Sequence, residues 1–256
     1  SENDLYTAEV RTNFGLIQSI FKKSSLLRFE NKLEAHTMGD ISLETHAEHY
    51  TYFPGTLIEQ MPILIAQGMT PISAADLMRQ RIWALSQPTE VKILWWNNHF
   101  HLGDAVLYHP DGKIKIELDS QLLRQLNAQS KLQDGQLGID SETYLSSRGK
   151  EFDGKEISPL GLPLSKTSIL AHPLWNYLAR EKELLEEYTT AVFEETQQFK
   201  YESNMGVYIN FTQGQMPLAV ALCMSELAGR SILYNSVLDH NKVRLIGTAS
   251  GRTSKT

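Results

Sequence analysis

The side chains most suited to chemistry lie close together in one stretch of the sequence. They are His99, His101, Asp104, Glu117 and Asp119. Imidazole nitrogens and carboxylate oxygens bind divalent metals and also carry protons during catalysis. If residues 99–108 form a regular strand, His99 and His101 lie on one face of it, as two metal ligands would. Asp104 follows closely enough to complete the set, so we predict a metal site at His99, His101 and Asp104.

Asp104 and Glu117 stand on two predicted strands of one hairpin, with helical patterns on either side, an outline that resembles the core of the PD-(D/E)xK nucleases. The resemblance implies that the two acids bind a divalent metal and that a lysine helps to activate water. Here Asp119 occupies the position of that lysine, so the candidate catalytic residues are Asp104, Glu117 and Asp119. The alternative is structural, with Asp104 accepting backbone amides at a strand edge and Asp119 capping a helix.

The turn of this hairpin decides whether Asp104 and Glu117 can meet. Pro110–Gly112 is typical of a three-residue loop, in which a type I turn is followed by a glycine at positive φ and a G1 bulge. In that register Glu117 lies beside Ala105 and is separated from Asp104. A two-residue loop would instead place Asp104 directly opposite Glu117. We favour the bulged register because it gathers the apolar residues of both strands on one face.

A second candidate site is the loop Asn210–Gln215, which is predicted to join a strand to the N-terminus of a helix. Free backbone amides and the positive end of the helix dipole suit an anion, including phosphate. The stretch 208–229 also loosely resembles the corresponding segment of the CRISPR-associated Rossmann-fold nucleotide sensors. We therefore predict a small anionic ligand, with four binding residues: Asn210, Thr212, Gln213 and Gly214. In the alternative interpretation the loop is a plain connection that provides a helix cap.

Two weaker patterns remain. His46 and His49, with Glu44 and Glu48 beside them, form a further metal candidate if their segment is helical. Cys223 lies among apolar residues, which is typical of a buried core thiol rather than a nucleophile.

These residues require a sheet with helices around it. Residues 91–118 are interpreted as an antiparallel meander, with strands at 91–96, 99–108 and 113–118. Residues 206–237 are interpreted as a βαβ unit, with parallel strands at 206–211 and 231–237 and a helix at 216–228. We therefore expect an α/β or α+β fold with a mixed sheet, formed by the meander and the C-terminal βαβ unit, and with helices packed on both faces.

Helical patterns fill most of the remaining chain. They are expected at 1–35, 57–67, from Ser73 to the residue before Pro88, at 120–132 and at 173–199, and the glutamates of the last helix form a solvated face. Ser73 is a good N-cap, with Asp76 placed as the acid of a capping box. Residues 133–171 are interpreted as a long irregular connection with one short strand near 136–139, suited to a lid or a domain sub-boundary. We expect one globular domain over residues 1–247 and a disordered tail at 248–256.

Composition limits the partners and the compartment. The net charge is −6, which argues against nucleic acid as a partner because no basic surplus neutralises phosphates. A single cysteine excludes a disulfide framework within the chain and Cys-rich zinc sites. No stretch approaches the ~20 apolar residues of a membrane span, and the N-terminal residues are acidic where a signal peptide would be basic. We therefore expect a soluble, cytoplasmic protein without a membrane partner.

Two functions stay open from the sequence. In the first, which we favour, the protein is non-catalytic and binds a small anionic molecule or a partner. In the second, it is a metal-dependent hydrolase or nuclease built on the acids and histidines of the hairpin. The pattern names no cofactor, no substrate and no oligomeric state.

Overall fold

The computed structural model describes residues 50–157, 164–197, 205–209, 215–226 and 231–249. The predicted helix at 1–35, the pair His46 and His49, and the predicted ligand residues Asn210–Gly214 lie outside this part of the chain. The described residues all belong to one compact unit, while the prediction of one domain over residues 1–247 stays a prediction. Within the described ranges, no helix combines the length and the apolar character needed to cross a membrane.

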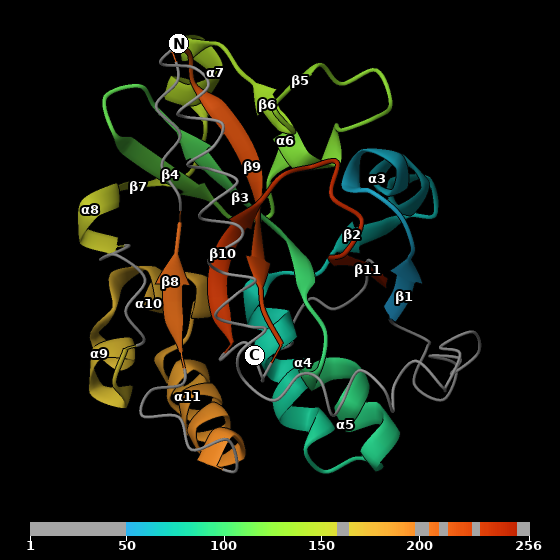
Figure 1. The fold of residues 1–256 in the computed structure, drawn as a ribbon, viewed down its shortest axis with the longest axis vertical. Coiled ribbons are helices and arrows are strands. Elements are labelled where there is room, and N and C mark those ends of the chain that lie inside the picture. Colours follow the sequence, from blue (N-terminus) through green and yellow to red (C-terminus); the bar gives the residue numbers. More distant parts are fainter. Residues whose placement is uncertain (1–49, 158–163, 198–204, 210–214, 227–230, 250–256) are drawn as a thin grey trace, which may run out of the picture. The chain divides into compact units, whose positions relative to one another are not determined.

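The predicted mixed sheet is confirmed. Along its main path the strands follow the order β1-β11-β3-β9-β10-β8, which can be followed in Figure 1. Strand β2 extends β11, β4 and then β7 extend β3, and the β5–β6 hairpin joins β9. The strands of the described part are β1 (Tyr50–Phe53), β2 (Met69–Pro71), β3 (Phe100–Tyr108), β4 (Lys113–Glu117), β5 (Leu132–Gln133), β6 (Gln136–Gly138), β7 (Lys150–Asp153), β8 (Gly206–Tyr208), β9 (Leu218–Met224), β10 (Ile232–Ser236) and β11 (Arg244–Ala249).

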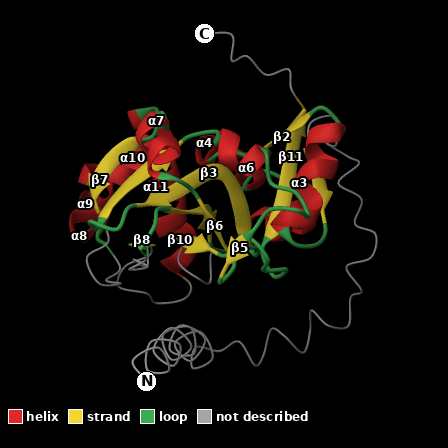
Figure 2. Ribbon diagram, turned by 90° about the horizontal axis from the view of Figure 1, so that it is seen from above, coloured by secondary structure: helices red, strands yellow, loops and turns green. Residues whose placement is uncertain are grey.

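Helices cover both faces of this sheet, as predicted. On one face, Ala105 and Leu107 of β3 pack in one core cluster with Leu57 of the first described helix and Leu123 of a short helix after β4. On the other face, a long C-terminal helix contacts β9, because the Tyr188 hydroxyl lies 3.2 Å from the sulfur of Met224. The helices of the described part are α3 (Leu57–Ala66), α4 (Ala74–Ala84), α5 (Thr89–Trp96), α6 (Gln121–Arg124), α7 (Ser141–Ser146), α8 (Gly154–Ile157), α9 (Lys166–Ala171), α10 (Pro173–Ala179) and α11 (Lys182–Thr196). Helix α3 and the pair α8–α9 flank opposite ends of the sheet (Figure 2).

The β3–β4 hairpin has the bulged register that the sequence favours. Ala105 lies opposite Glu117, and the amide of His109 donates to the carbonyl of Lys113 at 2.9 Å. Gly112 has a φ of 89°, as a G1 bulge requires. The two-residue alternative, which would have placed Asp104 directly opposite Glu117, is therefore excluded.

A bulge in β3 shapes the surroundings of Asp104. The pairing of β3 with β9 shifts between His101 and Ala105. Gly103 lies in this interval, and its backbone is held by the carbonyl of Ile72 and the amide of Ser120, both at 2.7 Å. A β-carbon added at Gly103 would lie 3.0 Å from the carbonyl oxygen of Pro71. The close approach explains the glycine, and the bulge turns the side chain of Asp104 toward the start of α4.

A buried arginine ties α4 to the sheet and to its neighbouring helices. Arg81 has no exposed surface. Its guanidinium donates to the carbonyls of Trp95, Asn98 and Ser225 and to the hydroxyls of Tyr188 and Ser231, at 2.9 to 3.2 Å. These five bonds use all five N–H donors that an arginine has. The rings of Trp96 and Phe100 lie 5.6 and 5.7 Å from the guanidinium carbon, within range of a cation–π attraction.

The first strand of the predicted meander is wrong, because residues 91–96 belong to helix α5. Its two tryptophans are buried in different surroundings. Trp95 stacks on Phe100 with ring centroids 5.6 Å apart, and the indole nitrogen of Trp96 donates to the carbonyl of Arg81 at 2.8 Å. These contacts with α4 and β3 outweigh the strand preference of the β-branched and aromatic residues.

The predicted helix at 216–228 is also wrong. Residues 218–224 form strand β9, which is buried along its whole length. A strand buried on both faces loses the apolar–polar alternation, so its apolar run resembles that of a buried helix. The predicted parallel pairing of the flanking strands is nevertheless confirmed, since β8 and β10 pair in parallel. The connection between them runs through β9, antiparallel to β10, and is not a helical crossover.

Four other segments differ from their predictions. The helix at 173–199 is interrupted at Arg180, whose φ of 65° is left-handed, and α10 and α11 lie on either side of it. The helix at 120–132 is only α6, which ends at Arg124. The described residues of 133–171 form short strands and helices around the predicted strand at 136–139, which is β6. Strand β11 continues through Thr248 and Ala249, two residues into the predicted tail.

Candidate functional site

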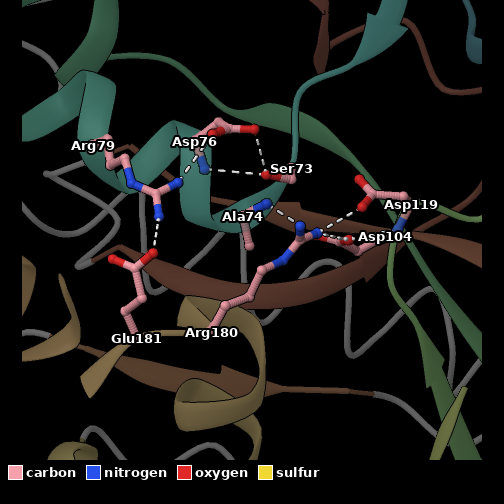
Figure 3. A network of polar contacts seen from close by, with 8 residues as sticks. All are labelled: Ser73, Ala74, Asp76, Arg79, Asp104, Asp119, Arg180 and Glu181. Atoms are coloured by element: carbon pink, nitrogen blue, oxygen red, sulfur yellow. Dashed lines mark hydrogen bonds and ion pairs between the residues drawn. The ribbon is translucent and has the colours of Figure 1, made fainter. Parts of the chain in front are cut away.

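Asp104, one of the predicted site residues, is fully buried, and every contact of its carboxylate comes from a different element (Figure 3). The amide of Ala74, the first residue of α4, donates to Oδ2 at 2.9 Å. The amide of Asp119 donates to Oδ1 at 3.1 Å. The hydroxyl of Ser73, the N-cap of α4, accepts a hydrogen bond from the amide of Asp76 at 3.1 Å, as its predicted capping role requires. Asp104 therefore joins the β3 bulge to the start of α4 and to the end of β4.

An ion pair lies above this buried carboxylate. Nη2 of Arg180 contacts Oδ2 of Asp119 at 2.8 Å and Oδ1 of Asp104 at 3.9 Å. Both Asp119 and Arg180 have left-handed backbones, with φ of 50° and 65°. Such conformations are uncommon for residues other than glycine, and here they bring two turns together. Asp119 and Ser120 were both candidate caps for the helix that follows, and the cap is Ser120, whose hydroxyl accepts from the amide of Leu123 at 3.4 Å.

Burial raises the pKa of Asp104 from its ordinary value of 3.8 to about 6. The amides of Ala74 and Asp119 and the charge of Arg180 act in the opposite direction, but they do not overcome the loss of water. Asp119 and Asp104 together raise the pKa of Arg180, against the effect of its own partial burial. The cluster thus holds one guanidinium between two carboxylates.

Exposed charges continue the network along the surface (Figure 3). Arg79 in α4 pairs with Asp76 at 3.1 Å and with Glu181 at 2.8 Å. All three side chains are more than two-fifths exposed, so these pairs contribute little to stability. They connect the start of α4 to the break between α10 and α11.

The three predicted catalytic acids have different partners. Asp104 and Asp119 share the partner Arg180, whereas Glu117 lies beside Ala105 and accepts the hydroxyl of Ser120. The hydrogen bonds of Asp104 agree with the structural alternative, in which its carboxylate accepts backbone amides. The catalytic assignment of the three acids stays a prediction.

The structure does not bring His99, His101 and Asp104 together as a group of three metal ligands. His99 pairs through Nε2 with Glu226 and lies 3.1 Å through Nδ1 from the hydroxyl of Tyr234. His101 is fully buried, and burial, with a smaller effect of the nearby His240, lowers its pKa to about 3. The bulge after His101 turns Asp104 away toward α4. Across the described ranges, no three His, Cys, Asp or Glu side chains gather closely enough to hold a metal ion.

Cys223 agrees with its prediction as a buried thiol. It has no exposed surface, and its sulfur lies 3.2 Å from Nδ1 of His101. Burial raises the pKa of the thiol, although hydrogen bonds with Ser236 and Tyr234 act against that change. A neutral, buried thiol is not a nucleophile.

No family model and no curated protein matches this chain. A solved structure described as "Accommodation of massive sequence variation in Nanoarchaeota by the C-type lectin fold" is similar to it, with a TM-score of 0.56 and 14% sequence identity. The match covers 78% of this chain and 96% of that chain. The chain resembles the C-type lectin fold. At this identity the likeness concerns the fold alone.

On this C-type-lectin-like scaffold, one groove lies between α4 and α11 and has a volume of about 460 Å³. Its apolar floor includes Ile82 and Leu85, and its acidic wall includes Glu187 and Glu194. In the sequence these glutamates belong to the predicted solvated face of a helix. Their proximity to α4 arises from the fold and leaves no signal in the sequence.

Arg180 was also missed by the sequence analysis. Nothing in its neighbours marks a left-handed residue, because the apolar pattern of a single helix continues on both sides of it. Its partners stand far away in the sequence, on the β3 bulge and after β4.

Proposed function

We propose that this protein is non-catalytic and acts by binding a partner on a C-type-lectin-like scaffold. The observation that carries the proposal is the state of Asp104, the most promising acid of the sequence. Both of its oxygens accept backbone amides and no part of it is exposed. A general base needs a free oxygen within reach of the proton that it removes.

The fold likeness supports the same proposal. The similar structure is described in terms of a C-type lectin fold that accommodates massive sequence variation. In this chain, β3 and β9 are buried along their whole lengths. The exposed charges of Asp76, Arg79 and Glu181 lie instead on α4 and at the break between α10 and α11.

A partner is a better ligand for this proposal than a small anion. The anion site at 210–214 depended on a helix N-terminus after the loop, and the segment that follows is strand β9. A strand has almost no dipole to attract an anion. The four predicted binding residues lie outside the described part of the chain, and their role stays a prediction without that support.

The experiment compares the full chain with its Asp104→Asn and Asp111→Asn variants. Hydrolysis of DNA, RNA and a chromogenic phosphodiester is measured with magnesium or manganese present. We expect no turnover above buffer in any of the three proteins. Turnover that Asp104→Asn abolishes, with an unchanged circular dichroism spectrum and with activity kept in Asp111→Asn, would establish the hydrolase alternative instead.

A further inference from the structure

The groove between α4 and α11 has an apolar floor and an acidic wall. Ile82 comes from α4, Leu85 directly follows that helix, and Ala191 comes from α11. Ile82 and Leu85 are half-buried, so part of their apolar surface meets water. The groove runs between two packed helices, and a third helix fits the space between two others.

Three of the four glutamates that line the groove have no ion-pair partner among the described residues. Glu183, Glu187 and Glu194 lie on one side of α11, at spacings of four and seven residues, and are exposed. No ion pair joins any of them to a cation among the residues that the structure describes. Like charges four residues apart, as at Glu183 and Glu187, destabilise a helix by about 0.2–0.5 kcal/mol.

Two cations lie at this groove, and each contacts one of its lining residues. Lys182 pairs with Glu186 at 3.5 Å, and both side chains are at least half exposed. The ammonium of Lys166 donates to the hydroxyl of Thr190 at 2.9 Å. Neither neutralises the row formed by Glu183, Glu187 and Glu194.

We propose that this groove binds a basic amphipathic helix of a partner protein, an inference that rests on the non-catalytic binding function proposed above. The apolar stripe of such a helix covers Ile82, Leu85 and Ala191, and its lysines or arginines pair with the glutamates. Helix-in-groove recognition uses apolar anchors at helical spacing in the same way. A nucleic acid is repelled by the acidic wall, and two copies of the same acidic face repel each other.

The test uses a synthetic peptide of about 18 residues, with leucines on one helical face and lysines elsewhere. Its affinity for the full chain is measured by fluorescence anisotropy. The double variant Glu187→Gln/Glu194→Gln removes two charges from the wall. A matched control, Glu90→Gln/Glu142→Gln, removes two exposed charges from α5 and α7, and therefore has the same net charge.

We expect the groove variant to weaken peptide binding about five- to tenfold and the control to leave it unchanged. A Leu85→Asn variant should also weaken binding, and hydrogen exchange should show protection of α11 on binding. Equal weakening in both double variants would mean attraction by net charge alone, and would overturn the proposal. Absence of binding at millimolar peptide would also overturn it. Neither outcome bears on the non-catalytic function, which the hydrolysis assays test separately.

Discussion

A carboxylate without access to water keeps its charge only if other groups replace that water. For Asp104 the replacements are two backbone amides and, further away, the guanidinium of Arg180. They do not fully compensate, which is why its pKa stays above the ordinary value. The same bonds make Asp104 a link between three segments of the chain, so its protonation affects how firmly they are joined.

The raised pKa of Asp104 predicts a pH dependence of stability. The folded protein binds this proton more tightly than the unfolded chain, because the pKa rises from 3.8 to about 6 on folding. The resulting stabilisation is complete below about pH 4 and is lost as the pH rises through about 6. It amounts to about 3 kcal/mol.

The unfolding free energy of the wild type minus that of Asp104→Asn should therefore increase as the pH falls from about 7 to about 4. Urea denaturation at several pH values measures it. Asp111→Asn is the control, since Asp111 is exposed and its pKa is lowered mainly by the amide of Lys113. A difference that stays constant over this range would contradict the role of Asp104.

Arg81 predicts a large effect from one buried side chain. Arg81→Met leaves three carbonyls and two hydroxyls without their donor. We expect the unfolding free energy to fall by about 3–5 kcal/mol, measured by urea denaturation. Arg79→Met, on the exposed face of the same helix, should change it by less than about 1 kcal/mol. Similar losses of unfolding free energy in the two variants would contradict the stabilising role of the buried Arg81 hydrogen bonds.

At the scale of elements, the turn of the β3–β4 hairpin provides the next prediction. A β-carbon at Gly112 would meet no atom within 4 Å, so only the φ of 89° opposes a substitution. Gly112→Val should lower the unfolding free energy by about 1–3 kcal/mol. Gly112→Asn should cost less, because asparagine tolerates a left-handed backbone better. Thermal denaturation compares them, and an unchanged melting temperature in Gly112→Val would contradict the bulged turn.

Local signals predicted the elements that local chemistry determines. Pro110–Gly112 fixed the hairpin register, and Ser73 marked the start of α4. Helix α5 and strand β9 were wrongly predicted, because their type depends on what surrounds them. In the helical form Trp95 stacks on Phe100 of β3, and Trp96 donates to the carbonyl of Arg81 in α4. The run at 218–224 is apolar on both faces because helices pack on both faces of the sheet and this strand is buried along its whole length.

The candidate site was predictable only in part, for a similar reason. The acids Asp104 and Asp119 were found from their residue types, and the hairpin register correctly separated Asp104 from Glu117. Their common partner, Arg180, stands at a helix break that no nearby glycine or proline announces. A contact between such distant positions is decided by the packing of α10 against the sheet, which a single sequence does not display.

For the molecule as a whole, the single cysteine offers a direct measure of cooperativity. Cys223 is fully buried in β9, a central strand. Burial raises the pKa of its thiol, so a thiol reagent should react only when the sheet opens. We expect labelling of the native protein to be slow and its free energy of opening to equal the global unfolding free energy from urea. Fast labelling without denaturant would reveal a local opening of β9 instead.

The pairing of β1 with β11 also determines how the sheet would respond to a pulling force. The two strands are antiparallel, and Tyr50 lies opposite Thr248, so the beginning of one strand stands beside the end of the other. A force applied at these two ends would load the interstrand hydrogen bonds one after another, as in opening a zipper. Strands loaded in shear must break all their bonds together, which needs a larger force. The sequential loading of β1 and β11 is therefore mechanically weaker than shear. Pulled in optical tweezers from these ends, the sheet should therefore give way first at β1.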